Sequence, residues 1–387
     1  MSQHSSHSPS AMFRTLLCAG SKRLEKQCPD KTSSHAIEGL VAHNLAAKCL
    51  DTGVSAMTLV GTVIAVEQET MTVSVEMAEY VQAYMDRLRE YQGDGQLLVE
   101  CRVDFSSSLT TEDAWGTSDA VVLKETEYQI HDLKYGRGYR VEAHQNAQLG
   151  LYALGALDEF GAMGIERVVM VIHQPRLSHT SEWIVTIDEL YSFANRVKAA
   201  IELAEKPDAP LTPGIEQCRF CKAKAICPAL EQVALNEFSN LNDPKAASNA
   251  QLGQARSKVD LIQTWCDAIV QETERRMTAG EPIPGMKFVL GKRGQRKWSD
   301  VSQASQLLKS MRLRDSEIFE SALISPATAE KLFKTNTIGP RQWASLQPFI
   351  TQAEAQPVAV LITDPRPEVD LTPTLDLFEQ IEPSGGV

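Results

Sequence analysis

The chain of 387 residues lacks the features of several large classes of protein. It has no run of about 18 apolar residues, the length that a helix needs to cross a bilayer, so we expect no membrane span. Its start, MSQHSSHSPS, is polar and contains no apolar core of a signal peptide, which favours a cytoplasmic protein. No internal repeat is visible. What remains is a globular protein long enough for one large domain and a smaller one.

A positive net charge is also missing. The formal net charge is −12, whereas proteins that bind nucleic acid are more often basic. Half of this excess lies in residues 351–387, which carry seven acidic residues and one basic residue. A bound cation would also change the local field. The charge therefore counts only weakly against a nucleic-acid partner.

The pattern of apolar residues predicts an α/β fold. Residues 12–27, 33–50 and 75–92 read as helices, and three β-rich runs follow: LLVECRVDF, TSDAVVL and EYQIHDLKY. A helix over 142–161, the runs ERVVMVIHQ and SEWIVTI, and a helix over 188–205 complete the series. The three runs indicate an antiparallel meander, and the whole order predicts a central mixed sheet flanked by helices.

The chain changes character after about residue 232. A helix over 249–279, a strand KFVLG and short helices over 301–347 predict a separate, mainly helical module in residues 233–350. Residues 1–11 and the acidic, Pro-rich residues 351–387 are expected to be disordered. This leaves residues 12–232 as the main domain.

Two carboxylates and a lysine stand on neighbouring predicted strands. Residues two apart in a strand share a face, so Asp132 and Lys134 of IHDLKYG point the same way. If the preceding strand pairs with this one, Asp119 of GTSD approaches Asp132, and such carboxylates repel unless a cation lies between them. A carboxylate can bind a hard cation, and an ammonium can orient water or stabilise a phosphate. Taken singly, Asp-x-Lys is more often a solvated pair, and Asp119 a turn residue that caps backbone N–H groups.

A histidine, a glutamine and a tyrosine lie on predicted helices. Gly39 precedes His43 by one turn in GLVAH, which lets a ligand or another backbone come close to that face. Gln148 and Tyr152 share a helical face, where they could hydrogen-bond a phosphate or a base, or position a lysine. The alternatives are an ordinary helical histidine and an ordinary amphipathic helix.

The order of these residues resembles the PD-(D/E)XK nuclease superfamily in its RecB-like branch, which includes the RecB and AddB nuclease domains and the CRISPR-associated RecB-like exonucleases. The G-x3-H, G-x-x-D, D-x-K and Q-x3-Y motifs of that branch look like GLVAH, GTSD, DLK and QLGLY here. The resemblance covers about residues 12–230 and is closest to a phage-borne group with the same GTSDA, DLKYGRG and NAQLGLYALGA runs. This chain has Asp132 where many members have glutamate.

The resemblance implies a restriction-endonuclease-like core that hydrolyses DNA phosphodiesters. The metal ligands for Mg²⁺ or Mn²⁺ would be His43, Asp119, Asp132 and the Leu133 carbonyl. Lys134 would position or activate the attacking water, with DNA contacts from Gln148, Tyr152 and Arg137. Glu100 is expected in the outer shell at most. The process implied is phage or prophage DNA recombination, repair or replication in a bacterial cytoplasm, with a single-strand annealing or single-strand-binding protein as a further partner.

Three of the eight cysteines, Cys218, Cys221 and Cys227, have a spacing that indicates a metal or cluster site. Such a site needs a fourth ligand. The resemblance implies that Cys18 supplies it and that a [4Fe–4S] cluster clasps the nuclease core, with a four-cysteine zinc site as the alternative. Cys28 competes for the fourth position. The other three are expected to be small buried hydrophobes: Cys49, Cys101 and Cys266.

The C-terminal module contains the densest basic stretch, GKRGQRKW. Backbone contact and base stacking with DNA would involve Arg293, Lys297 and Trp298. The alternative is a solvated hairpin.

The acidic tail contains the run TLDLF, which resembles the bacterial sliding-clamp-binding peptide. The anchoring residues would be Leu375, Leu377 and Phe378, with Thr374 where glutamine is commoner. The resemblance makes the host sliding clamp an expected partner.

The sequence therefore predicts a metal-dependent DNA nuclease, in the first place an exonuclease. One alternative is a non-catalytic DNA-binding or scaffold protein of the same fold. The presence of His43, Asp119, Asp132 and Lys134 together argues against it, because a decayed site usually loses one of them. The other alternative is a zinc-stabilised interaction protein.

Overall fold

The computed structural model describes residues 5, 7–29, 34–66, 69–240, 245, 247–311, 313–319, 323–361 and 364–369. The chain forms two compact units, Met1–Asp267 and Ala268–Val387, which are described separately. The division falls within a helix, α10 (Asn249–Thr278), whereas the sequence had placed a boundary near residue 232.

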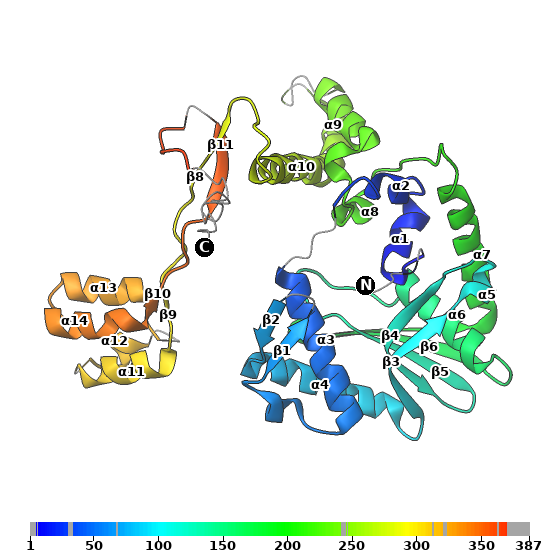
Figure 1. Ribbon diagram of the computed structural model, residues 1–387, viewed down its shortest axis with the longest axis horizontal. Coiled ribbons are helices and arrows are strands. Elements are labelled where there is room, and N and C mark those ends of the chain that lie inside the picture. The colour runs from blue at the N-terminus through cyan, green and yellow to red at the C-terminus, as the bar shows by residue number, and fades with distance from the viewer. Residues whose placement is uncertain are drawn as a thin grey trace, which may run out of the picture. The chain divides into compact units, whose positions relative to one another are not determined.

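A five-stranded sheet forms the centre of the first unit (Figure 1). Its strands, in spatial order, are β3 (Gln96–Asp104), β4 (Trp115–Leu123), β5 (Glu127–Leu133), β6 (Arg167–Gln174) and β7 (His179–Thr186). Only β5 and β6 run parallel, and the other neighbours are antiparallel. The predicted meander and the mixed sheet of an α/β fold are confirmed.

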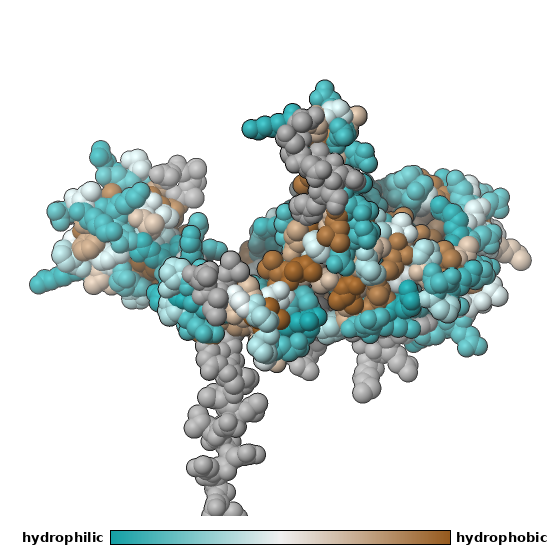
Figure 2. Space-filling view, turned by 90° about the horizontal axis from the view of Figure 1, so that it is seen from above, coloured by the Kyte–Doolittle hydropathy of each residue, from teal (hydrophilic) through white to brown (hydrophobic). Residues whose placement is uncertain are grey.

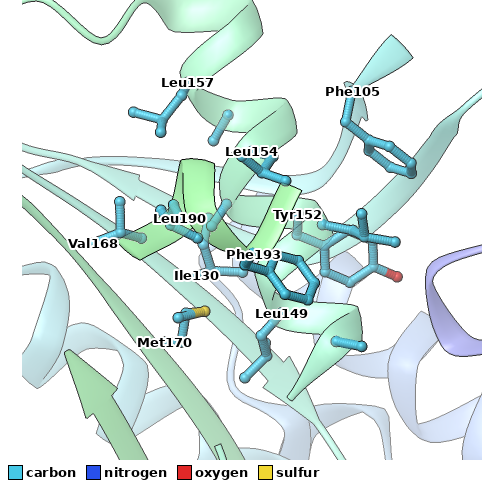
Figure 3. Packing of buried hydrophobic residues seen from close by; sticks show 14 of the residues in the cluster. Phe105, Ile130, Leu149, Tyr152, Leu154, Leu157, Val168, Met170, Leu190 and Phe193 are labelled. Carbon is cyan, nitrogen blue, oxygen red and sulfur yellow. The ribbon is translucent and has the colours of Figure 1, made fainter. Parts of the chain in front are cut away.

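Helices cover both faces of this sheet. On one face, α1 (Pro9–Leu17), α6 (Ala147–Phe160) and α7 (Ile187–Ala204) enclose the larger apolar core, part of which is drawn in Figure 3. On the other face, α3 (Ser34–Thr52) and α4 (Val75–Gln92) enclose the second core. The pleat of β5 divides its side chains accordingly, with Ile130 in the first core and Leu133 in the second.

Two helices of this unit, α6 and α4, begin at caps that the sequence encodes. The side chain of Asn146 accepts hydrogen bonds from the amides of Gln148 and Leu149, which starts α6. The side chain of Ser74 does the same for the Met77 amide and starts α4. These caps satisfy N–H groups that a helix leaves unpaired at its first turn.

The structure differs from the expected single helix over 12–27. The chain breaks into α1 and α2 (Ser21–Glu25) at Gly20, whose amide donates to the Pro210 carbonyl at 2.9 Å. A Cβ atom at Gly20 would lie 2.5 Å from the Ala209 oxygen, so only glycine allows the backbones this close. The remaining elements of the unit are η1 (Ala56–Leu59), β1 (Val63–Val66), β2 (Glu69–Thr72), α5 (Ser106–Leu109), η2 (Pro175–Leu177), α8 (Ile215–Arg219), η3 (Lys224–Ile226) and α9 (Pro228–Asn240).

The second unit contains two short antiparallel ladders and a small helical core. Its elements after α10 are β8 (Met286–Leu290), β9 (Lys297–Trp298), α11 (Val301–Ser310), α12 (Asp315–Ile318), α13 (Pro326–Lys334), α14 (Pro340–Leu346), η4 (Gln347–Phe349), β10 (Ile350–Thr351) and β11 (Pro357–Leu361). The expected disorder from residue 351 is not seen at its start, because β11 pairs with β8. No helix in the described ranges is both long and apolar enough to cross a membrane.

Candidate metal site at the fork between β4 and β5

The two strands that carry the predicted carboxylates separate at Asp119. Their ladder ends at the pair Ala120 and His131. Beyond that point the Asp119 carboxylate accepts the Leu133 amide at 2.6 Å, in place of a backbone carbonyl. β5 stays paired with β6 as far as Leu133 and His173. The fork therefore leaves the end of β5 without a β4 partner and still satisfies this amide.

Three candidate ligands converge at this fork. Ligand atoms of His43, Glu100 and Asp119 all lie within 4.8 Å of one another, and among the described residues no other such group of histidine, cysteine and acidic side chains occurs. His43 Nδ1 lies 3.0 Å from Asp119 Oδ1. The three side chains line a small cavity together with Tyr84 and Leu133. The sequence had predicted two of these ligands but had kept Glu100 in the outer shell.

A backbone distortion brings Glu100 to this position. Its neighbours Val99 and Cys101 pair with Ala120 and Ser118, which leaves Glu100 opposite Asp119. Glu100 has a φ of +46°, in the left-handed region that non-glycine residues rarely adopt. Such strain gathers at functional sites when the surrounding structure holds it. No residue type in LLVECRVDF signals this distortion, so it could not be predicted from the residues alone.

Asp132 and Lys134 form a second, connected group on the α6 side of the fork. Lys134 Nζ lies 2.9 Å from Asp132 Oδ2 and donates to Gln148 Oε1 at 2.9 Å. The Gln148 amide nitrogen donates to Asp132 Oδ1 at 2.9 Å and contacts the Tyr152 hydroxyl at 3.1 Å. The four side chains predicted from D-x-K and Q-x3-Y are thus hydrogen-bonded into one network. Their catalytic and DNA-binding roles stay predictions.

Close packing explains the glycine of the GTSD motif. A Cβ atom at Gly116 would lie 2.6 Å from Pro9 Cγ and 2.8 Å from Tyr152 Cε1. Tyr152 packs in the larger core, and its hydroxyl points away from the aliphatic residues labelled in Figure 3. Gly39, by contrast, has open space where a Cβ atom would stand, one turn before His43. Close packing therefore requires a glycine at Gly116, whereas the space around Gly39 would admit a larger side chain.

The acidic side chains at the fork, Glu100, Asp119 and Asp132, outnumber the basic ones, His43 and Lys134. Burial lowers the pKa of His43, but the adjacent Asp119 carboxylate outweighs burial and raises that pKa to about 9. Burial opposes the charge on Asp119 too, and His43 outweighs it, so the pKa of Asp119 is lowered. Burial raises the pKa of Asp132 despite Lys134. Burial and the Asp119 charge raise the pKa of Glu100. A divalent cation would relieve the repulsion among these carboxylates.

The donor atoms fit a divalent cation. Asp132 Oδ2 has only its ion pair with Lys134, and the Tyr84 hydroxyl is buried. Neither atom has a well-aligned hydrogen-bond partner in the part of the chain that the structure describes. Carboxylate oxygens suit Mg²⁺ and Mn²⁺, whereas an imidazole nitrogen suits transition metals. The mixed set of His43, Glu100 and Asp119 is therefore compatible with a divalent cation.

The four predicted cluster ligands line one small pocket in the same unit. Its wall contains Cys18, Cys218, Cys221 and Cys227. The Thr212 amide donates to Cys18 Sγ at 3.3 Å, and the Gly214 amide donates to Cys218 Sγ at 3.4 Å. No three cysteine sulfurs of the described chain lie within 4.8 Å of one another, so they do not form a compact cluster.

The other cysteines differ partly from expectation. Cys28, the competing ligand, does not line the cysteine pocket, and its thiol donates to the Leu24 carbonyl at 3.8 Å. Cys49 is buried as expected, but Cys101 and Cys266 are only half-buried.

The remaining predicted residues lie away from the fork or outside the described chain. Arg137 forms an exposed ion pair with Glu76 at the start of α4. Trp298 is half-buried: its indole N–H donates to the Ile324 carbonyl at 2.7 Å, and its ring packs against the core of the second unit. Its role in base stacking stays a prediction. Arg293 and Lys297 are exposed. The predicted clamp-binding residues, Leu375, Leu377 and Phe378, lie outside the described residues.

Comparison with known proteins assigns the chain to a family. The family described as "Protein of unknown function (DUF2800)" matches residues 4–367. The chain belongs to the DUF2800 family. Among solved structures, this DUF2800 chain is similar to one titled "Crystal structure of SSO0001", with 12% sequence identity, coverage of 56% of this chain and 85% of that chain, and a TM-score of 0.27. Neither description names an activity, so the resemblance to RecB-like nucleases stays a prediction.

Proposed function

We propose that this DUF2800 protein is a metal-dependent DNA nuclease that hydrolyses phosphodiester bonds. The observation that carries the proposal is the Lys134–Asp132 pair at the same fork where His43, Glu100 and Asp119 converge. A buried ion pair alone is often structural. Here Asp132 is 2% exposed while the Lys134 side chain is 31% exposed, so the pair lies where the buried carboxylates meet the more accessible part of the lysine. Such a lysine is close enough to the carboxylates to act on a phosphate bound there.

The side chains would divide the work of the reaction. When bound, the cation would polarise the phosphate and lower the pKa of a coordinated water. His43, Glu100, Asp119 and Asp132 would hold it. The Lys134 ammonium would orient the attacking water and stabilise charge that grows on the phosphate oxygens. Leu133 lines the cavity, and its carbonyl remains a proposed ligand.

Gln148 fixes the lysine for this role. It accepts a hydrogen bond from Lys134 and donates one to Asp132, so the ammonium cannot turn away without losing its contacts with both Asp132 and Gln148. The cap at Asn146 fixes the first turn of α6, from which Gln148 projects. Preorganisation of this kind lowers the cost of assembling the site when DNA binds.

We also propose that the cysteine pocket holds a [4Fe–4S] cluster. A single zinc ion with Zn–S bonds of ~2.3 Å requires sulfurs about 3.8 Å apart. The observed sulfurs share one pocket but are not that compact, which favours a larger group. Such a cluster would join the α1–α2 junction to residues 218–227. Iron analysis and absorbance near ~400 nm test this, and stoichiometric zinc without colour would overturn it.

DNA is the proposed substrate, and two protein partners remain proposals. A single-strand annealing or single-strand-binding protein would act on the same DNA. The sliding clamp would bind the TLDLF run of the tail. A peptide with this sequence should bind purified clamp, and no measurable binding at high micromolar concentration would end that part of the proposal.

The activity is tested with end-labelled linear single- and double-stranded DNA in the presence of Mn²⁺ or Mg²⁺. Wild type should cut, and Lys134→Ala should cut on the order of 10² to 10³ times more slowly, because it loses a donor to the charged phosphate. Lys48→Ala removes an exposed lysine of α3 and is the matched control, with unchanged activity expected. A wild type that cuts neither DNA, or a Lys134→Ala variant as active as wild type, would contradict the proposal and favour a scaffold role.

A further inference from the structure

The loop that follows Lys134 holds an exposed tyrosine in a fixed place. Residues 135–146 leave β5 and carry Tyr139, which is 44% exposed. The side chain of Gln174, at the end of β6 and 2% exposed, donates to the Tyr139 carbonyl at 3.0 Å and accepts the Val141 amide at 2.7 Å. A buried amide thus fixes the loop on both sides of Arg140. The ring of Tyr139 is exposed on a backbone that is not free to move.

Tyr139 meets an aromatic residue from the cysteine segment. Its ring centroid lies 5.6 Å from that of Phe220, with the planes inclined by 32°. The guanidinium carbon of Arg219 lies 5.0 Å from the Tyr139 ring centroid. Phe220 is 52% exposed and stands between two cysteines that line the pocket, Cys218 and Cys221.

This group has the chemistry of a base-stacking surface. Singly exposed apolar residues are common, and Figure 2 shows hydrophobic residues among the hydrophilic ones on the face it presents. Two half-exposed rings in mutual contact with a guanidinium are a different case, because each offers a π-face or a cation to a flat ligand. Arg140 is exposed on the same loop, which adds positive charge for a phosphate backbone.

The group is also near the proposed active site. Tyr139 follows Lys134 by five residues, so the two Cα atoms are at most about 18 Å apart. An extended single strand of a few nucleotides is long enough to span this distance. A stacked base could therefore belong to the same strand as the phosphate at Lys134.

We propose that Tyr139, Phe220 and Arg219 form a platform that stacks an unpaired base of single-stranded nucleic acid next to the Lys134 site. The inference rests on the proposed nuclease function and names its substrate class, an unpaired strand or a frayed end. A duplex cannot use the platform, because its bases already stack on one another. The competing explanation is that the rings only join the loop to α8, in which case their loss changes stability and not affinity.

Equilibrium binding separates these explanations. The full-length Lys134→Ala protein with Mn²⁺ serves as a background in which hydrolysis is slow, and the probes are fluorescent dT15, rU15, dT15 with abasic sites, and a 15-base-pair duplex. Phe220→Ala should weaken dT15 binding by about 5- to 150-fold, the effect expected for loss of one stacked base worth ~1–3 kcal/mol. Phe220→Trp should restore it, and abasic dT15 should not respond to either change. The rU15 arm shows whether the sugar matters.

Two further variants keep the result decisive. Tyr139→Ala lies in a different segment and should weaken dT15 binding as Phe220→Ala does, even if the latter misfolds. Tyr191→Ala removes an exposed tyrosine of α7 and should change nothing. Equal dT15 binding by Phe220→Ala, Tyr139→Ala and the background, or equal losses for duplex and single strand, would overturn the platform. Loss of dT15 binding together with a wild type that cuts no DNA would leave the platform standing and refute the nuclease.

Discussion

The fork and the cysteine pocket are both candidate metal sites, but they are held together in different ways. The fork gathers side chains from one sheet and from helices packed on it, and its own hydrogen bonds fix His43, Asp119 and Lys134 in place. The cysteine pocket joins segments far apart in the chain, as in the bond from Thr212 to Cys18 across 194 positions. We therefore expect loss of the metal from the preorganised fork to remove its chemical activity. We expect loss of the metal group from the cysteine pocket, which closes a long loop, to lower the stability of the fold.

The largest expected effect comes from removing a ligand at the fork. Asp119→Asn keeps the shape and can still accept the Leu133 amide, but it loses the charge that faces His43 and the cation. DNA cleavage should fall by more than about 100-fold, since even groups behind the ligands cost 10- to 100-fold. Mn²⁺ affinity by calorimetry should fall, while the unfolding temperature in EDTA should change little at a pH above about 9, where the charged His43–Asp119 pair no longer contributes. A variant that still binds Mn²⁺ as tightly as wild type would remove Asp119 from the ligand set.

Cys18→Ser and Cys218→Ser should produce the opposite pattern. Each should lose iron and the absorbance near ~400 nm, and each should lower the unfolding temperature by on the order of 10 °C, because a cross-link between distant segments restricts the unfolded chain. At low temperature the folded fraction should still bind Mn²⁺ at the fork. Cys266→Ser, on α10, is the matched control and should leave iron content and stability unchanged. Unchanged stability in the first two variants would break the comparison.

A smaller effect, the dependence of the unfolding temperature on pH, should sharpen the comparison between the fork and the cysteine pocket. Burial disfavours the charged form of His43, but Asp119 outweighs burial and raises the pKa from 6.5 to about 9. The protonated pair therefore stabilises the metal-free fold fully below pH 6.5, and this contribution is lost as the pH rises through about 9. With Mn²⁺ the trend should reverse, because a metal ligand must be unprotonated. Unfolding temperatures at pH 6, 7.5 and 9, with EDTA or Mn²⁺, measure both trends. In the His43→Asn variant the unfolding temperature should depend less on pH, both with EDTA and with Mn²⁺.

The structural features that depend on local periodicity could be predicted from the sequence. The alternation in EYQIHDLKY placed Asp132 and Lys134 on one face of a strand, and the structure confirms this through their contacts with Gln148. The predicted meander and flanking helices follow from the same periodicity. The hairpin of β1 and β2 was missed because its strands have four residues each and one of them, Glu69–Thr72, is polar.

What the sequence could not predict depends on backbone strain or distant contacts. Glu100 joins the ligands only because its φ is positive, and no residue type encodes that in a strand. Trp298 lies in a basic run from which we expected contact with DNA. Its ring packs against a core formed by helices that follow it in the chain. The run PVAVL became β11 because β8 offers it a partner. In each case a tertiary contact overrode the local pattern.

The distortion at Glu100 has an effect on the sheet as a whole. β3 is an edge strand of nine residues, and its outer side has no neighbouring strand within the described chain. A flat edge of that length is a template on which another chain can add a strand and start aggregation. The reversed φ at Glu100 interrupts the row of amides and carbonyls near its middle. The same local strain that aims a carboxylate at the fork thus interrupts an edge on which another chain could add a strand.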